Sequence, residues 1–391
     1  MSSPSERRDE AIELPRIAAD FGFSEEHALA REAARRFLGE RCPVTELRRL
    51  ASDPRGYEPA VFKALAELGW IGLVSPAEYG GVGLDHLHLA LLSDELGRCL
   101  LPSPLFGCWL ALRAIERAGT KQHCQNLCGP IITGEKVASF ALFERSGVFE
   151  PEQIEARATP VAGGFLLEGV KPHIPFGAAA ELVIVPLQTP DAGLGLFAVE
   201  LPTPGARIDA ETNVDPTRRT AKLTLEGARV SSAARLDGDA VSALSAVHQL
   251  GVVALSAEMV GGSEAVFEMT RRYACERQQF GRAIGAFQAV KHPLVDMMVG
   301  IELARSLALG AAAALDQDPE RAELEGRMAK AFASDVYASV TRKAVQLHGG
   351  FGFTWDCDVH FYFKRALATR ALLGDATHHR RRIAGRLFDS A

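Results

Sequence analysis

Four long helical segments in series most constrain how this chain can fold. Apolar residues at helical spacing predict helices at 241–277, 287–316, 319–348 and 357–372. Pro293 suggests that the second helix begins near His292, and Asp316-Gln-Asp-Pro319 separates the second helix from the third. Long amphipathic helices that follow one another closely bury their apolar faces against each other. We therefore expect residues 239–391 to form a C-terminal four-helix bundle.

The part of the chain before residue 239 contains three segments that differ in sequence pattern and composition. Residues 1–21 lack a patterned apolar core and are expected to form a disordered tail. Residues 22–135 have helical periodicity, and Ser24 is a plausible N-cap. Residues 136–238 are rich in proline, glycine and short β-branched runs, and strands are expected at 137–142, 164–167, 182–186 and 196–199. The sequence therefore predicts an α+β multidomain protein, with a helical domain, a small β-sheet domain and a helical bundle.

Composition excludes several classes of function. With 47% hydrophobic and 24% charged residues, the chain has the composition of an ordinary globular protein. Its net charge of −6 does not indicate binding to nucleic acid. The uncharged stretch Ala240–Ala257 is interrupted by polar residues, so we expect a buried helix and no membrane span. The seven scattered cysteines suit reduced thiols in the cytoplasm. Cys124 and Cys128 have helical spacing beside His123 but lack a second ligand cluster, so no metal site is predicted.

Two motifs in the helical region indicate a site for a large phosphate-bearing cofactor. Arg277, Gln279 and Gln288 surround a break at Phe280-Gly281, and a guanidinium can pair a phosphate through two hydrogen bonds. The second motif begins at Gln346 and contains a turn with Gly349, Gly350 and Gly352. Glycines let the backbone approach a ligand and leave N–H groups free to bind anions.

These motifs resemble the FAD-binding signatures of the acyl-CoA dehydrogenase family. Other segments resemble that family as well: Pro76-Ala-Glu-Tyr-Gly-Gly-Val-Gly83, Asp94-Glu-Leu-Gly97, Ser139-Phe-Ala-Leu-Phe-Glu144 and Gly169-Val-Lys171. The resemblance covers roughly residues 22–385. It implies the same three-part fold, with FAD between the sheet domain and the bundle and a neighbouring subunit completing the site. Phe140, Leu142 and His173 are then expected on the sheet side of the flavin.

The same resemblance implies the reaction and the partners. Family enzymes introduce an α,β double bond into an acyl-CoA thioester: a carboxylate removes the α-proton, and the β-hydrogen leaves as hydride to the flavin. Electron-transfer flavoprotein is the expected electron acceptor. The protein is expected to form a homo-oligomer or a heterotetramer with a paralogue.

The expected general base is missing from both usual positions. In many family members a glutamate lies about 27 residues after the first glutamine of the glycine motif, which here is Leu373. In another branch it lies about 26 residues before the motif arginine, which here is Gly251. Glu258 and Asp375 are the remaining weak candidates for the base. For Glu258 a structural contact with an arginine or a backbone group is the favoured alternative, and for Asp375 a role at a helix end.

A second departure affects the flavin side. Where family members often have Lys-x-Trp-Ile-Thr, this chain has Lys171-Pro-His-Ile-Pro175, so Pro175 supplies neither a hydroxyl nor a backbone donor. Asp215-Pro-Thr-Arg-Arg219 resembles bacterial members that work as pairs of unlike subunits. Three hypotheses therefore stay open: an acyl-CoA dehydrogenase, a catalytically deficient flavin-binding subunit of a heteromeric dehydrogenase, and a flavin oxidase on the same fold.

Overall fold

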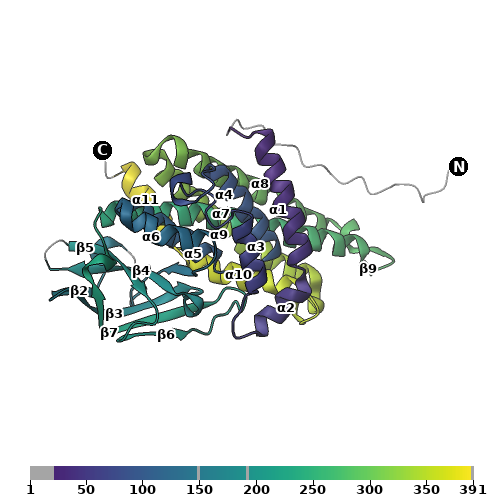
Figure 1. Ribbon diagram of the computed structural model, residues 1–391. Coiled ribbons are helices and arrows are strands. Elements are labelled where there is room, and N and C mark those ends of the chain that lie inside the picture. The colour runs from purple at the N-terminus through teal and green to yellow at the C-terminus, as the bar shows by residue number, and fades with distance from the viewer. Residues whose placement is uncertain (1–21, 148–149, 191–192, 389–391) are drawn as a thin grey trace.

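The chain folds into helices, then a sheet, then longer helices, as Figure 1 shows from purple to yellow. The computed structural model describes residues 22–147, 150–190 and 193–388, so the predicted tail at 1–21 lies outside the described residues. The N-terminal helices are α1 (Glu25–Arg41), α2 (Val44–Ser52), α3 (Pro59–Glu67), α4 (His86–Cys99), α5 (Leu105–Ala118) and α6 (Lys121–Ile132). Ser24 is the N-cap of α1, and its side chain accepts a hydrogen bond from the backbone of His27.

A single mixed sheet forms the middle of the chain. Its strands are β1 (Ala138–Phe140), β2 (Arg157–Val161), β3 (Gly164–Pro175), β4 (Leu182–Thr189), β5 (Gly193–Glu200), β6 (Ala206–Ala210), β7 (Thr220–Ser231) and β8 (Arg235–Leu236). The strand order is β6-β7-β3-β2-β4-β5-β8, and β1 pairs in parallel with β4. The predicted strand segments are present, but β2, β6, β7 and β8 were not predicted. In β7, for example, charged Lys222, Glu226 and Arg229 alternate with buried residues and mask the apolar pattern.

The C-terminal region contains five helices: α7 (Ala240–Glu276), α8 (Gln288–Gln317), α9 (Pro319–His348), α10 (Val359–Ala371) and α11 (Ala376–Phe388). The four predicted helices are confirmed, and α11 is an additional helix. The expectation that α8 begins near His292 is wrong, because α8 begins at Gln288 and includes Pro293. A small hairpin of β9 (Gln278–Gln279) and β10 (Arg282–Ala283) separates α7 from α8.

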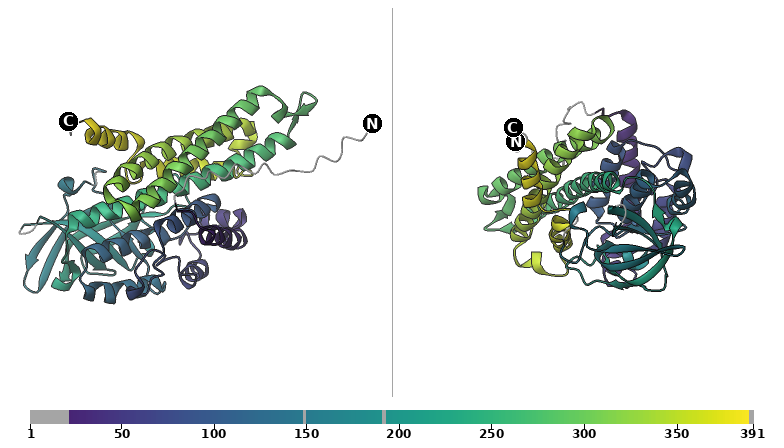
Figure 2. Two further views of the ribbon diagram at one scale, coloured as in Figure 1. Left: turned by 90° about the horizontal axis from the view of Figure 1, so that it is seen from above. Right: turned by 90° about the vertical axis from the view of Figure 1, so that its left-hand side faces the viewer.

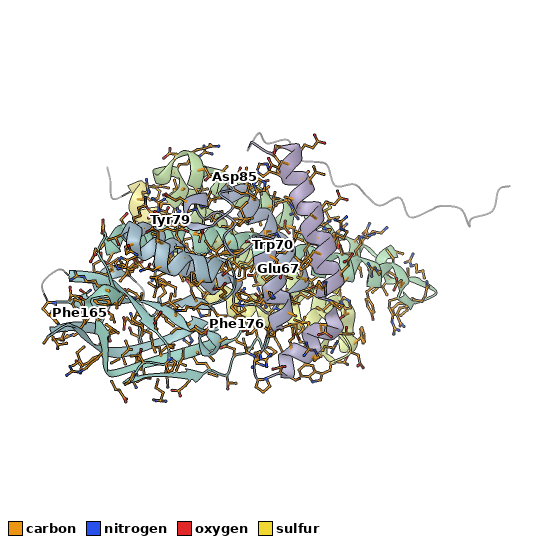
Figure 3. All side chains as sticks on the ribbon, in the orientation of Figure 1. Glu67, Trp70, Tyr79, Asp85, Phe165 and Phe176 are labelled. Carbon is orange, nitrogen blue, oxygen red and sulfur yellow. The ribbon has the colours of Figure 1, made fainter. Side chains whose placement is uncertain are left out.

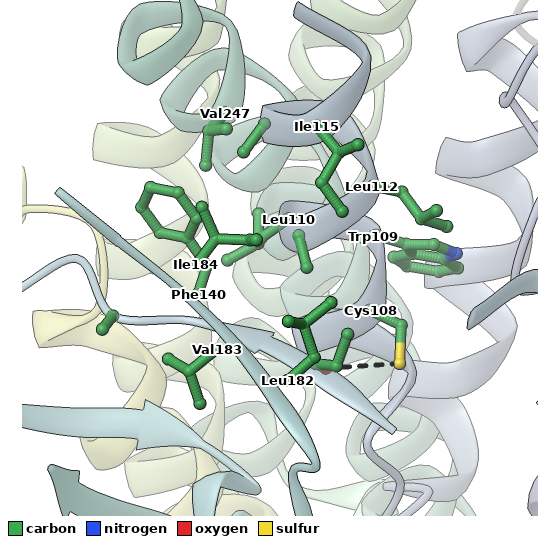
Figure 4. Packing of buried hydrophobic residues seen from close by; sticks show 14 of the residues in the cluster. Cys108, Trp109, Leu110, Leu112, Ile115, Phe140, Leu182, Val183, Ile184 and Val247 are labelled. Atoms are coloured by element: carbon green, nitrogen blue, oxygen red, sulfur yellow. Dashed lines mark hydrogen bonds between the residues drawn. The ribbon is translucent and has the colours of Figure 1, made fainter. Parts of the chain in front are cut away.

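Helix α7 connects the two hydrophobic cores. Its N-terminal half packs with α5 and the sheet, where Val247, Leu110, Phe140 and Ile184 belong to one cluster (Figure 4). Its C-terminal half packs with α8 and α9 around Val260. Helices α7 and α8 are long and apolar enough to cross a membrane by length and composition alone. Because α7 is largely buried between α4, α5, α8 and α9, its composition is that of a core helix.

Two glycines let α4 and α7 approach each other closely. A Cβ atom on Gly97 of α4 would lie 2.0 Å from the carbonyl oxygen of Glu258 in α7. A Cβ atom on Gly261 of α7 would lie 1.8 Å from the carbonyl oxygen of Asp94 in α4. Each glycine thus faces the backbone of the other helix, which cannot yield as a flexible side chain would.

We expect Gly97→Ala to lower the free energy of unfolding by about 1–3 kcal/mol, because the added methyl forces the two backbones apart. Gly39→Ala on α1 is the matched control, since no atom lies within 4 Å of its added methyl. It should be neutral or stabilise the helix by about 0.5–1 kcal/mol. Urea denaturation of the two variants checks this, and equal midpoints would contradict the proposed close contact.

Candidate functional site

The two positions expected to hold the base lie against each other. A Cβ atom on Gly251 would lie 2.4 Å from Cδ1 of Leu373, 3.2 Å from Cδ2 of Leu110 and 3.7 Å from Cζ of Phe106. Leu373 is buried and adopts a left-handed backbone conformation, with φ of 58°. The two positions at which the family resemblance places the glutamate, 251 and 373, are therefore in contact in the fold. Apolar side chains fill the space between them.

A cavity begins beside this spot. Phe106 and Ala254 line it, together with Pro175 and Phe176 from the end of the sheet that faces the helices (Figure 3). Its volume is about 540 Å³ including the open mouth. Aromatic and aliphatic side chains form most of the wall, which suits a hydrophobic ligand.

Charged groups form one end of the cavity. Arg218 donates to both carboxylate oxygens of Glu258. Arg365 of α10 donates to Glu258 at 2.8 Å and also pairs with Asp215, which is fully buried. Three of these residues come from different elements: the loop before β7, α7 and α10. This cluster closes the cavity with two cations and two anions.

These contacts make Glu258 a poor general base. Burial acts to raise the pKa of Glu258, but Arg218 and Arg365 outweigh burial and hold this pKa below its usual value. Glu258 also lies seven residues from Gly251, about 10 Å along the helix. The expected contact with an arginine is present, and a carboxylate that is this strongly paired has little tendency to accept a proton.

Asp375 has a different role. Its carboxylate accepts a hydrogen bond from the backbone N–H of His378 at 2.7 Å, at the start of α11. The side chain is exposed and faces the helix terminus. This is the N-cap arrangement of a helix end, as the alternative interpretation of Asp375 expected.

Buried polar groups hold Leu373 and Gly374 in place. The Nε2 atom of His248 donates to the carbonyl of Leu373 at 3.2 Å. The ammonium of Lys330, which is fully buried, donates to the carbonyls of Gly374, Arg370 and Thr369 at 3.0–3.4 Å. Burial lowers the pKa of Lys330 to about 7, although the charge of Asp375 acts in the opposite direction.

The predicted cofactor residues of the helical region gather at the far end of the bundle. Tyr273 near the end of α7 stacks on His348, with ring centroids 4.4 Å apart, which brings the glycine turn beside the hairpin. Seven of the residues are exposed: Arg277, Gln279, Phe280, Gln288, Gln346, Gly349 and Gly350. Gly352 is buried against the carbonyl of Val345. Within the described ranges, the guanidinium of Arg277 has no ion pair or side-chain hydrogen bond. We call this surface the distal tip.

The sheet side of the expected cofactor site lies elsewhere. Figure 2 shows the hairpin at the end of the long helices that is remote from the sheet. Helix α7 spans this separation with 37 residues, which corresponds to roughly 55 Å. The structure of one chain therefore does not bring the distal tip together with Phe140, Leu142 and His173.

The three sheet-side residues differ in exposure: the His173 side chain is exposed, whereas those of Phe140 and Leu142 are buried. The side chains of Phe140 and Leu142 are buried in the core, so only their backbone is available. His173 lies at an irregularity of β3, with φ of 58°, and its backbone N–H and Nδ1 both contact Glu211 at 3.1 Å. The carbonyl of Pro175 accepts a hydrogen bond from Ser139 at 2.7 Å.

Two motif segments meet in a buried ion pair. Lys171 of β3 donates to Glu144, and both side chains are almost completely excluded from solvent. Burial lowers the pKa of Lys171 to about 8, and Glu144 opposes this effect. The pair fixes the loop after β1 against β3, which positions Phe140 and Leu142 relative to His173.

Among the described residues, one group of side chains has metal-ligand chemistry: His27 of α1 with Asp85 and His88 at the start of α4. Figure 3 labels Asp85 there. The Nδ1 atom of His27 accepts from the backbone of Ser24 at 3.1 Å, so its Nε2 holds the proton and donates to Asp85. Asp85 also accepts from His88 and caps α4. Asp85 is thus hydrogen-bonded to both histidines.

Sequence reasoning did not identify the charged end of the cavity. Arg218 and Asp215 were noticed only as part of a motif, and Arg365 was not singled out. A usable signal exists for Arg365, because it is a lone arginine among the buried residues Phe361, Tyr362 and Ala366 of one helix. Such an arginine needs a buried anion as a partner.

The chain is similar to members of one known family over most of its length. The family model "Acyl-CoA dehydrogenase, N-terminal domain" matches residues 24–135, and "Acyl-CoA dehydrogenase, C-terminal domain" matches residues 246–388. A probable acyl-CoA dehydrogenase of Bacillus subtilis, YngJ, is 31% identical over 85% of this chain and 90% of its own length. Acyl-CoA dehydrogenase IpdE2 of Mycolicibacterium smegmatis is 28% identical over 94% of this chain and 100% of its own. A chain of the ChsE4-ChsE5 complex from Mycobacterium tuberculosis superposes with a TM-score of 0.87 at 27% identity, and the match covers 94% of this chain and 98% of that chain.

The buried Lys330 predicts a specific pH dependence of stability. Its pKa is about 7 in the folded protein and near 10.4 in the unfolded chain. Between these values the unfolded chain holds the proton and the folded protein has released it, so raising the pH favours the folded state. The stability advantage of the wild type over Lys330→Met should grow by about 1.4 kcal/mol per pH unit between pH 7 and 10.

Chemical denaturation at pH 6, 7, 8 and 9 measures this difference. Below pH 7 both states hold the proton, and the difference should be constant. Lys63→Met is the control, because Lys63 is exposed on α3. A difference for Lys330→Met that is as flat as that for Lys63→Met would show that Lys330 has an ordinary pKa.

Proposed function

Because the chain belongs to the acyl-CoA dehydrogenase family, we propose that it is a subunit of an FAD-dependent acyl-CoA dehydrogenase built from unlike chains. In this assembly its distal tip completes the FAD site of a partner subunit, and the partner supplies the general base. The single observation behind this proposal is the apolar contact between Leu373 and Gly251, where neither residue can accept a proton.

The distal tip fits the phosphate-bearing part of FAD. Arg277 offers a guanidinium, and Gly349 and Gly350 offer open backbone, since no atom lies within 4 Å of a Cβ at either glycine. Backbone N–H groups and a guanidinium are suitable partners for a pyrophosphate. FAD must also contact a sheet domain, and the 37-residue α7 keeps this chain's own sheet too far away. A second subunit therefore has to provide it.

Exposed aromatic side chains near the tip support such an assembly. Phe280 is 90% exposed, Phe353 80% and Trp355 65%. Large apolar side chains that gather at one surface are typical of protein–protein contacts. An unlike partner agrees with the match to a chain of the ChsE4-ChsE5 complex.

When bound, FAD would accept the β-hydrogen of the thioester as hydride. This chain's residues would contribute binding: Arg277 would neutralise phosphate charge, and the glycine turn would donate backbone hydrogen bonds. The α-proton would be taken by a carboxylate of the partner. Electron-transfer flavoprotein would receive the electrons, and the assembly would work in the cytoplasm.

The alternatives are a self-sufficient dehydrogenase and a flavin oxidase on the same fold. A self-sufficient enzyme needs a base within reach of the α-carbon, and Glu258 is paired with two arginines while Asp375 caps a helix. No observation of the described residues favours the oxidase.

We expect Arg277→Ala to weaken FAD binding in the assembled protein by roughly 10–100-fold, because a charge-assisted phosphate contact is lost. Flavin absorbance after gel filtration, and the Kd for FAD added back, measure the effect. Arg229→Ala removes the same charge from an exposed position of β7 and should retain wild-type flavin content. Equal flavin content in all three proteins would remove Arg277 from the proposed site.

Without a paralogue, a second copy of this chain would have to supply the sheet side of the FAD site. Such an assembly of this chain alone should reduce added FAD with butyryl-, octanoyl- or bulky acyl-CoA roughly 10²–10⁴-fold more slowly than the complete assembly, because general-base catalysis is missing. Anaerobic flavin bleaching measures the rate, first with the chain alone and then with the paralogue added. Fast bleaching by the chain alone would refute the need for a partner. Glu258→Gln and Asp375→Asn would then show which carboxylate takes the proton.

A further inference from the structure

Two histidines and an aspartate from separate parts of the N-terminal region meet at the start of α4. His27 is the third residue of α1, Asp85 is the N-cap of α4, and His88 is the third residue of α4. The Nε2 atom of His27 lies 3.1 Å from both carboxylate oxygens of Asp85, and Nδ1 of His88 lies 2.7 Å from Oδ1. One ligand atom from each residue lies within 4.8 Å of the other two. The three side chains thus point into one small space.

The surroundings hold both imidazole rings in place. His27 is 5% exposed and His88 is 6% exposed. Their ring centroids lie 4.0 Å apart, and Phe23 stacks on His27 at 5.6 Å. Side chains that are already fixed lose little conformational entropy when they bind an ion. The two rings are therefore preorganised as a pair of nitrogen ligands.

The carboxylate between the rings is charged and partly open to solvent. The Asp85 side chain is 40% exposed, and among the described residues it forms no ion pair with a lysine or an arginine. The neighbouring His86 is engaged elsewhere, because its backbone N–H and its Nδ1 contact Asp316 at 2.9 Å and 2.6 Å. This contact anchors the start of α4 to the end of α8. The site thus has a fixed frame, a negative charge and access to water.

The second nitrogen of each ring permits coordination by the first. The Nδ1 atom of His27 lies 2.7 Å from Oγ of Ser24, so the ring can carry its proton on Nδ1, donate it to this hydroxyl and leave Nε2 free. A histidine that binds a metal commonly donates its other N–H to an oxygen in this way. The Nε2 atom of His88 is buried and has no hydrogen-bond partner among the described residues. No contact at Nε2 therefore prevents the His88 proton from moving there from Nδ1.

We propose that His27, Asp85 and His88 bind a divalent first-row transition-metal ion such as Zn²⁺, which joins the start of α1 to the start of α4. Two imidazoles and a carboxylate suit Zn²⁺, which three protein ligands and a water molecule can hold. Mg²⁺ and Ca²⁺ instead prefer shells of oxygen atoms. None of the three residues lines the cavity beside Phe106, so the metal site is separate from it. The sequence gave no spacing signal for this site, because His27 and Asp85 are 58 residues apart.

Isothermal titration of the untagged full-length protein with zinc chloride tests the proposal. The wild type should bind one Zn²⁺ per chain. Its thermal unfolding midpoint should rise with the zinc concentration, because the complete set of ligands exists only in the folded state.

Three conservative variants remove one ligand each and keep its structural contact. His27→Gln retains a residue that suits the capping box of α1, and Asp85→Asn retains an N-cap for α4. His88→Asn retains a side-chain N–H near the position of Nδ1. Each variant should bind Zn²⁺ at least roughly 100-fold more weakly, because loss of an outer contact of a metal site alone costs about 10–100-fold. If one variant does not fold, the other two decide.

His123→Gln is the matched control. His123 occupies the same capping-box position in α6, but its Nε2 contacts the carbonyl of Ala233 and no carboxylate. This variant should bind Zn²⁺ as the wild type does. The proposal would be overturned if the wild type bound no zinc, if it bound only weak ions whose affinity the three variants did not change, or if His123→Gln had the same effect as His27→Gln. The flavin content of Arg277→Ala tests the proposed function independently of each of these results.

Discussion

The close crossing of α4 and α7 is the constraint on which the rest of the structure depends. Gly97 and Gly261 let the two backbones touch, so the carbonyls of Glu258 and Asp94 occupy the space that side chains would otherwise fill. Helix α7 is thereby fixed relative to the N-terminal helices. Its two halves then complete two separate hydrophobic cores, one shared with the sheet and one with α8 and α9.

Buried charges lie on both sides of this crossing. On one side Glu258 pairs with Arg218 and Arg365. On the other, Arg305 of α8 pairs with Asp94 and Glu264. Buried ion pairs contribute little net stability, because desolvation offsets their attraction, but removing one partner is strongly unfavourable. We infer that the two clusters set the register of α7 against its neighbours. The cluster around Glu258 also forms the charged end of the cavity.

The length of α7 separates two kinds of chemistry in one chain. The cavity and the contact between Gly251 and Leu373 lie near its N-terminal half, and the motifs at Arg277 and Gly349 lie beyond its C-terminal end. Among the described residues, Arg277 and the first two glycines of the turn are exposed, while the cavity is lined by side chains of the same chain. The layout of this chain therefore places its cavity and its two sequence motifs at opposite ends of one helix.

The amino-acid sequence by itself determined the three-part order of the fold, because helical and strand periodicities differ locally and need no long-range contact to be recognised. It also indicated that positions 251 and 373 lack a carboxylate. Tertiary structure alone decided that these two positions are in contact, since α7 and the turn after α10 are more than a hundred residues apart. It alone brought Arg218, Glu258 and Arg365 together, because charge pairing across elements leaves no periodic signal. Tertiary structure also decided the separation of the distal tip from the sheet. A motif shows which groups are present in the chain. Only the length of α7 shows that the groups of the tip and of the sheet in one chain are too far apart to contact the same ligand.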